Sequence, residues 1–248
     1  MFLENLTIDP RFCGPSQSGN GGYVCGRIAG HISDTASVSL RVPPPLEKEL
    51  CMEKAEDRVR LMDGDILIGE GASSELDIKI PDFISFEEAV EASKNYAGFR
   101  HHSFPRCFVC GTLREEGDGL RIFAGGIKDK GLVASPWIVD ASLAGEDGRV
   151  SDAFIWAALD CPGAFAVASF EKGKAIVLGQ LEARIEGKVK PGDRCIAMGW
   201  PLGVNGRKRM AGSAVFSESG DLLGLARAVW VEIPENLFPP ENPCTDSV

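Results

Sequence analysis

Two stretches of the chain repeat one order of apolar and polar positions. Each opens with small and apolar residues at helical spacing, continues into a strand-like segment and closes on a second one. The paired segments are residues 19–29 and 150–160, 38–42 and 181–185, and 77–81 and 230–234. Only the first copy begins with a glycine-rich turn, and only the second ends its helix on a carboxylate, that of Asp160. The pattern predicts two units with a similar frame and different chemistry.

The hydrophobic periodicity also predicts the elements of each unit. After the first helix we expect strands at residues 38–42, 50–61 and 66–80. In the second unit we expect a helix from Ser151, broken at Pro162, because proline removes a helical hydrogen bond. Its strands are predicted at 119–123, 131–137, 175–186, 194–199, 208–216 and 222–233. Between the units, Ser85 and Glu88 have the spacing of a capping box, and we expect the helix that they begin to bridge the units.

A curved antiparallel sheet wrapped around one apolar helix explains this order of elements, because such a helix needs small and apolar residues on most of its faces. We therefore expect an α+β fold with two antiparallel curved sheets, each wrapped around a central apolar helix and pairing edge to edge. The expected divisions are an N-terminal half at 1–82, a connecting helix and linker at 83–112, a C-terminal half at 113–236, and a poorly ordered tail at 237–248.

Composition and charge narrow the classes of function. The 248 residues carry a net charge of −10 without a basic stripe, which argues against nucleic acid as a partner. No apolar run reaches transmembrane length, and the first residues lack the basic segment and apolar core of a signal peptide. The eight cysteines are scattered, so we expect reduced thiols. The sequence predicts a cytoplasmic protein that binds no membrane.

Short motifs resemble the hotdog-fold superfamily, in the thioesterase-like group that includes phenylacetic-acid-pathway thioesterases. Asn20-Gly21-Gly22 stands where that group usually has His-Gly-Gly, and Asp160 stands where it has a helical acid. The segments 107–111 and 156–163 are similar to uncharacterised members. The resemblance implies a double hotdog that hydrolyses acyl-CoA or acyl-carrier thioesters and assembles as a homo-oligomer. It implies no cofactor other than the coenzyme A that is part of the substrate.

The resemblance also implies the roles of site residues. Gly22, with Tyr23, is expected to polarise the thioester carbonyl through backbone N–H groups, because a helix N-terminus offers free donors and partial positive charge. Asp160 is expected to activate water or to attack as a nucleophile. Asn20 or Gln17 is then expected to position the water. Two further residues are expected to contact substrate: Gly21, and Gln180 at the position of a strand acid in the acyl-CoA thioesterase II group.

Other interpretations remain open at this point. The protein can be a catalytically silent hotdog protein that binds acyl-CoA or a similar ligand, because Asn20 replaces the motif histidine and Ala164 stands where some thioesterases have threonine. Asp160 can instead satisfy backbone groups around Pro162, and Asn20 can simply cap the helix. A dehydratase is disfavoured, because it needs a histidine with an acid and no histidine fits. At most one composite site is expected, since Ala29 replaces the acid in the first half.

The pair Cys107-x-x-Cys110, preceded by His101 and His102, raises the question of a metal. Structural zinc sites need four nitrogen or sulfur ligands, usually from two separated knuckles, and no second Cys-x-x-Cys is present. A compact site completed by a histidine, a buried turn and a redox pair are the alternatives. We expect the turn, and no metal.

Overall fold

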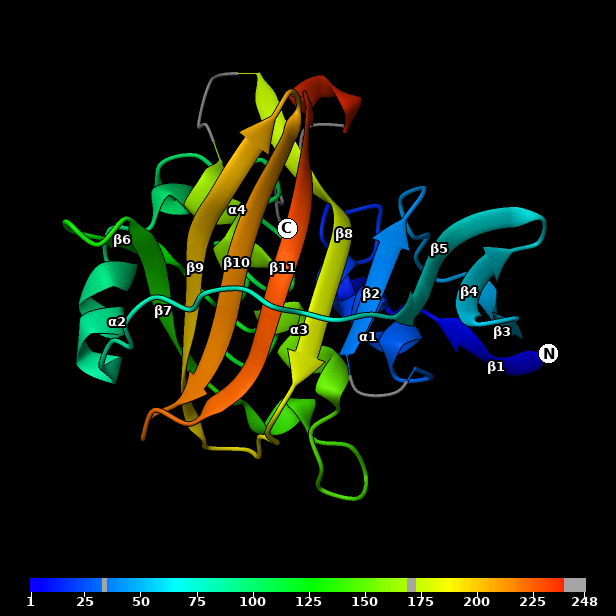
Figure 1. Cartoon of the computed structure of the whole chain (residues 1–248), viewed down its shortest axis with the longest axis horizontal. Coiled ribbons are helices and arrows are strands. Elements are labelled where there is room, and N and C mark those ends of the chain that lie inside the picture. Colours follow the sequence, from blue (N-terminus) through cyan, green and yellow to red (C-terminus); the bar gives the residue numbers. More distant parts are fainter. Residues whose placement is uncertain (33–34, 169–172, 239–248) are drawn as a thin grey trace, which may run out of the picture.

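The computed structural model describes residues 1–32, 35–168 and 173–238, and within them eleven strands form one antiparallel sheet (Figure 1). Along the sheet the order is β1-β3-β4-β5-β2-β8-β11-β10-β9-β7-β6. The strands are β1 (Phe2–Thr7), β2 (Thr35–Leu40), β3 (Glu49–Ala55), β4 (Arg58–Asp63), β5 (Ile66–Ser73), β6 (Gly125–Ile127), β7 (Leu132–Ile138), β8 (Lys174–Ile185), β9 (Arg194–Asn205), β10 (Lys208–Ser217) and β11 (Leu222–Pro234).

The two expected sheets are joined into this single sheet by β2 and β8. These strands pair antiparallel, from Thr35 opposite Arg184 to Ser39 opposite Gln180. Outward from this junction the order is β2-β5-β4-β3-β1 on one side and β8-β11-β10-β9-β7-β6 on the other. Strands from the two halves of the chain therefore continue one hydrogen-bonded ladder.

Four α-helices accompany the sheet in the described part of the chain: α1 (Gly21–Ala29), α2 (Phe86–Ser93), α3 (Asp152–Ala158) and α4 (Cys161–Val167). α1 and α3 cross antiparallel at two glycines. A Cβ atom at Gly22 would lie 2.8 Å from the carbonyl oxygen of Trp156, and one at Gly26 would lie 2.7 Å from Cα of Ala153. Only glycine permits this approach, so the two glycines set how closely the N-terminus of α1 comes to the end of α3.

Hydrophobic side chains fill both faces of the sheet. The larger cluster lies between the sheet and α1, α3 and α4, and includes Ile28, Leu181 and Trp156. The smaller cluster lies on the other face, where residues 74–84 run across the strands of the C-terminal half (Figure 1). This crossing segment bridges the halves. α2, which has the predicted capping box at Ser85, packs instead against β6 and β7 of the C-terminal half.

The structure departs from the sequence predictions in a few places. Residues 119–123 are not a strand, because Leu120 and Ile122 donate backbone hydrogen bonds to the loop carbonyls of Phe108 and Val109. β1 and β6 were not expected, and the predicted strand 50–61 is split into β3 and β4. The second helix ends before Pro162, at Ala158, which is the residue whose carbonyl the proline ring would contact. The tail from 239 on lies outside the described residues.

Candidate functional site

Asp160 lies in the two-residue break between α3 and α4 and is only 2% exposed. Its Oδ2 atom accepts a hydrogen bond from Nδ2 of Asn20 at 2.9 Å and another from the backbone N–H of Gly22 at 3.1 Å. Its Oδ1 atom is buried and has no hydrogen-bond partner within the described residues. Buried polar atoms are normally paired, so an unpaired carboxylate oxygen is unusual and marks a place where a ligand or water can bind.

Burial raises the pKa of Asp160 to about 7, and negative charge on the neighbouring Cys107 sulfur adds to the rise. The hydrogen bonds from Gly22 and Asn20 act in the opposite direction, because they stabilise the charged form. A carboxyl group with a pKa near neutrality exchanges a proton readily at physiological pH, which is the property needed in a general acid or base.

The first turn of α1 presents one free donor. Oδ1 of Asn20 caps the helix by accepting from the N–H of Tyr23 at 2.9 Å, and the N–H of Gly22 donates to Asp160. The N–H of Val24 already bonds to the carbonyl of Asn20. The N–H of Gly21 has no acceptor among the described residues. Of the two N–H groups that the resemblance implies as donors to substrate, Tyr23 is therefore engaged by the cap and Gly22 by the acid.

A cavity of about 350 Å³ opens beside these groups. Asn20, Gly21 and Asp160 line its polar end, together with three cysteine side chains. Most of the remaining wall is apolar and comes from both halves of the chain, and includes Leu40, Phe165, Ile176, Leu178, Trp230 and Val231. A concave, mainly apolar pocket with a few convergent polar groups is the usual form of a small-molecule site.

The other residues expected to contact substrate lie elsewhere. The ring of Tyr23 stacks on Phe12 at 4.5 Å between centroids, in an aromatic cluster outside the cavity wall. Gln17 is exposed and does not line the cavity. Gln180 donates to Oγ of Ser37 at 2.7 Å, across the β2–β8 junction and outside the cavity wall. Gly21, Asn20 and Asp160 are thus the predicted residues that come together at the cavity.

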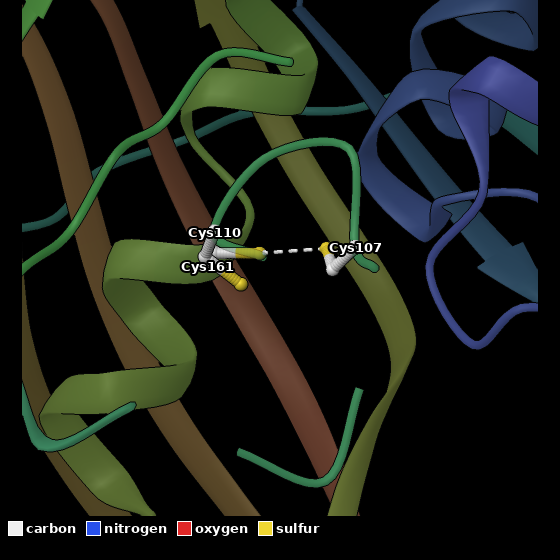
Figure 2. A group of neighbouring side chains, drawn as sticks. All are labelled: Cys107, Cys110 and Cys161. Carbon is white, nitrogen blue, oxygen red and sulfur yellow. Dashed lines mark hydrogen bonds between the residues drawn. The ribbon is translucent and has the colours of Figure 1, made fainter. Parts of the chain in front are cut away.

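The cavity wall also holds a cysteine cluster, of which the sequence indicated only the pair Cys107 and Cys110. Cys161 joins Cys107 and Cys110, and all three sulfur atoms lie within 4.8 Å of one another (Figure 2). Hydrogen bonds with Cys110 and Cys161 hold the pKa of Cys107 well below its usual range. His102 does not join the cluster, since its Nδ1 accepts from the N–H of Phe104 and its Nε2 lies 3.1 Å from the carbonyl of Cys110.

His101, the other histidine considered with the cysteine pair, is not a member of the cluster either. Its Nε2 lies 2.9 Å from a carboxylate oxygen of Glu235, and its side chain is about half exposed. The third member of the cluster is therefore a cysteine from the start of α4, far away in the sequence. Its only sequence signal was its position directly after the candidate acid.

Comparisons with known proteins give a match in structure alone. No protein-family model matches the chain. No curated protein matches it either. Among solved structures, the tesB protein of Mycobacterium avium subspecies paratuberculosis is 12% identical, with a TM-score of 0.59 over 94% of this chain and 96% of that one. A putative thioesterase from Novosphingobium aromaticivorans is 11% identical, with a TM-score of 0.58 over 93% and 97%.

A third solved structure names the architecture. It is a conserved protein of unknown function with a hot dog fold from Alicyclobacillus acidocaldarius, 9% identical, with a TM-score of 0.57 over 94% of this chain and 96% of that one. This chain has the hotdog fold. The resemblance seen in the short motifs is thereby confirmed for the fold, over nearly the whole length of the chain. Within the described residues of this hotdog protein, no helix has the length and apolar character needed to cross a membrane.

Proposed function

We propose that the protein hydrolyses the thioester bond of an acyl-CoA or acyl-carrier substrate, at one composite site between its two halves. The observation that carries the proposal is that a mainly apolar cavity is lined by Asp160, a buried acid whose Oδ1 atom has no hydrogen-bond partner among the described residues. A solved structure of the same fold, named a putative thioesterase, supports the reaction class. An acyl chain suits the apolar wall, because burying it removes apolar surface from water.

The free groups of the site define the roles. The N–H of Gly21 polarises the thioester carbonyl, because it lines the cavity at the positive end of α1 and has no acceptor among the described residues. Asn20 and Gly22 hold Oδ2 of Asp160, which leaves Oδ1 to accept the proton of an attacking water. The water oxygen bonds to the carbonyl carbon, the carbon–sulfur bond breaks, and the released thiolate takes up the proton that Asp160 had accepted from water.

An internal duplication accounts for the single site. Strand order outward from the β2–β8 junction is matched in the two halves, and α1 and α3 cross antiparallel at Gly22 and Gly26. The symmetry-related site would need a carboxylate on α1 at Ala29 and a glycine turn before α3, where Ser151 caps the helix instead. Both pieces are missing from that position, so one site per chain follows.

A second function is favoured by one contact. The N–H of Gly22, the donor that the resemblance assigns to the substrate carbonyl, is occupied by Asp160. If the Gly21 N–H does not replace it, the cavity binds acyl-CoA or a similar ligand without turnover. Turnover and saturable binding without turnover are therefore the two outcomes that separate the functions.

The test measures hydrolysis of a panel of short, long and aromatic acyl-CoA thioesters by wild-type protein and by Asp160→Asn. We expect turnover of at least one substrate and a loss of about a hundredfold or more in kcat for the variant, the usual effect of removing a general base. Asp65→Asn, an exposed charge change in a turn, is the matched control and retains activity. Wild-type activity in Asp160→Asn contradicts the assigned base, and binding without turnover across the panel supports the binder.

A further inference from the structure

Three thiols from two distant segments meet at the cavity wall. Cys107 and Cys110 come from the loop after α2, and Cys161 comes from the start of α4. Their side chains are buried, at 4%, 3% and 5% exposure, and their sulfurs lie within 4.8 Å of one another (Figure 2). Burial of one cysteine is ordinary, because a free cysteine behaves as a small hydrophobe. Three sulfurs converging on one point need a further explanation.

The loop that carries Cys107 and Cys110 is fixed before any ligand binds. The N–H of Gly111 donates to the carbonyl of Cys107 at 2.8 Å, and the N–H of Phe108 donates to the carbonyl of Cys13 at 2.7 Å. A Cβ atom at Gly111 would lie only 2.5 Å from the carbonyl oxygen of Cys107, so a glycine is required there. This tight turn places both sulfurs on the side of Cys161, and a preorganised ligand set costs little to assemble on binding.

The spacing of the sulfurs fits a tetrahedral metal ion. Zinc–sulfur bonds are about 2.3 Å long, so two sulfurs on one tetrahedral zinc ion are about 3.8 Å apart. The sulfurs of Cys107 and Cys161 lie 3.8 Å apart. A disulfide would need about 2 Å between two sulfurs and would leave the third thiol unpaired. The Cys107–Cys161 distance, with the third sulfur within 4.8 Å of both, thus suits a tetrahedral metal ion better than a disulfide.

We propose that Cys107, Cys110 and Cys161 bind one Zn²⁺ ion, with the fourth position open to the cavity. All three cysteines line the cavity, so a water molecule from it can complete the tetrahedron. Binding releases the thiol protons that the cluster still carries, since cysteines coordinate zinc as thiolates. Three protein ligands with one open position is the arrangement of zinc sites that meet small molecules, whereas structural sites are closed by four protein ligands.

The first experiment measures metal in wild-type protein. The chain is expressed with added zinc, purified anaerobically with a reductant, and dialysed before elemental analysis. We expect one zinc ion per chain. Replacement by Co²⁺ is expected to give a tetrahedral spectrum whose sulfur-to-cobalt charge-transfer intensity corresponds to three thiolates. Protein that stays free of zinc and cobalt under these conditions, or an octahedral cobalt spectrum, overturns the proposal. A disulfide between any two of the three cysteines in that protein overturns it as well.

The second experiment uses variants with matched controls. Cys107→Ser, Cys110→Ser and Cys161→Ser are each expected to lose the stoichiometric metal. Cys51→Ser, at a half-buried cysteine in β3, and Cys195→Ser, at a buried cysteine in β9, are expected to keep it. Equal loss in the control variants would contradict the assigned ligands. If a ligand variant does not fold, the cobalt spectrum of the wild-type protein still decides.

The zinc proposal does not rest on the proposed hydrolysis. Asp160→Asn leaves all three sulfur ligands in place, so this variant is expected to bind zinc as wild type does. A variant that loses turnover and keeps zinc supports both assignments. Zinc binding without turnover in the wild-type protein supports the metal site and contradicts the proposed hydrolysis.

Discussion

The substitution Asp160→Asn tests whether the buried carboxyl group of Asp160 is a functional acid or a structural anchor. An asparagine has the same shape, and its single oxygen can accept both hydrogen bonds that Oδ2 now accepts from Asn20 and Gly22. Its nitrogen then takes the place of Oδ1, which has no partner among the described residues. The substitution therefore removes the charge and keeps the local hydrogen bonds.

The structure gives the size of the expected effect on stability. Burial raises the pKa of Asp160 from 3.8 to about 7. At about 1.4 kcal/mol for each tenfold change in proton affinity, ionising this group costs the folded protein about 4 kcal/mol relative to the unfolded chain. Because the folded protein holds the proton more tightly, the stability from this group is fully present below pH 3.8 and is lost as the pH rises through about 7.

The assay is urea unfolding of reduced, chelator-treated wild type and Asp160→Asn, so that metal content is the same in both. The variant has no group to ionise at this position. The free energy of unfolding of the variant minus that of wild type should therefore increase by about 2.5 kcal/mol from about pH 5 to about pH 8. Asp65→Asn changes the same charge in an exposed turn, and its difference from wild type should stay constant across this range.

Two results would refute this reasoning. A stability difference that does not change with pH would show that Asp160 pays no penalty for its charge when buried. A variant that is less stable than wild type at both pH values would show that the carboxylate anchors the start of α1. In that case Asp160 would be better interpreted as a structural residue than as a general base. The sequence left this alternative open.

Three further substitutions test the rest of the site. Gly22→Ala places a Cβ atom 2.5 Å from Cβ of Asp160, and urea unfolding should show a loss of about 1–3 kcal/mol, together with loss of turnover. Asn20→Ala removes the cap of α1, so the free energy of unfolding should fall by about 1 kcal/mol. It also removes one hydrogen bond to Asp160, so the pKa of Asp160, read from the pH profile of kcat/KM, should rise. Tyr23→Phe should leave kcat and KM unchanged, because this ring lies outside the cavity wall.

The strands and helices with strong periodicity could be predicted from the sequence, and the weak ones could not. α2 follows from the spacing of Ser85 and Glu88 alone, since a capping box is a local interaction. β1 has a single buried side chain, Leu6, so its pattern carries no alternation. From Leu120 to Phe123 the residues alternate in burial as they would in a strand, although their hydrogen bonds go to a loop. Tertiary context decides such cases.

Some residues of the candidate site could be predicted from the sequence, but their hydrogen bonds could not. Asp160 could be singled out because a carboxylate that ends an apolar run is costly to bury. The sequence does not report distances across a helix crossing, so it did not show that Asp160 takes the N–H of Gly22 and leaves that of Gly21 free. Cys161 could not be linked to Cys107, because the connection runs through tertiary packing.

The close crossing of α1 and α3 connects the fold to the asymmetry of its chemistry. Gly22 and Gly26 lie one helical turn apart on the face of α1 that meets α3, so the helices approach closely along this face. That approach brings the end of α3 to the donors at the start of α1, where Asp160 meets the N–H of Gly22. A side chain at either glycine would push the helices apart and separate the acid from its donors. The site therefore needs both the glycines of α1, which permit the close approach, and the carboxylate at the end of α3, which uses it. Only this end of the crossing has both.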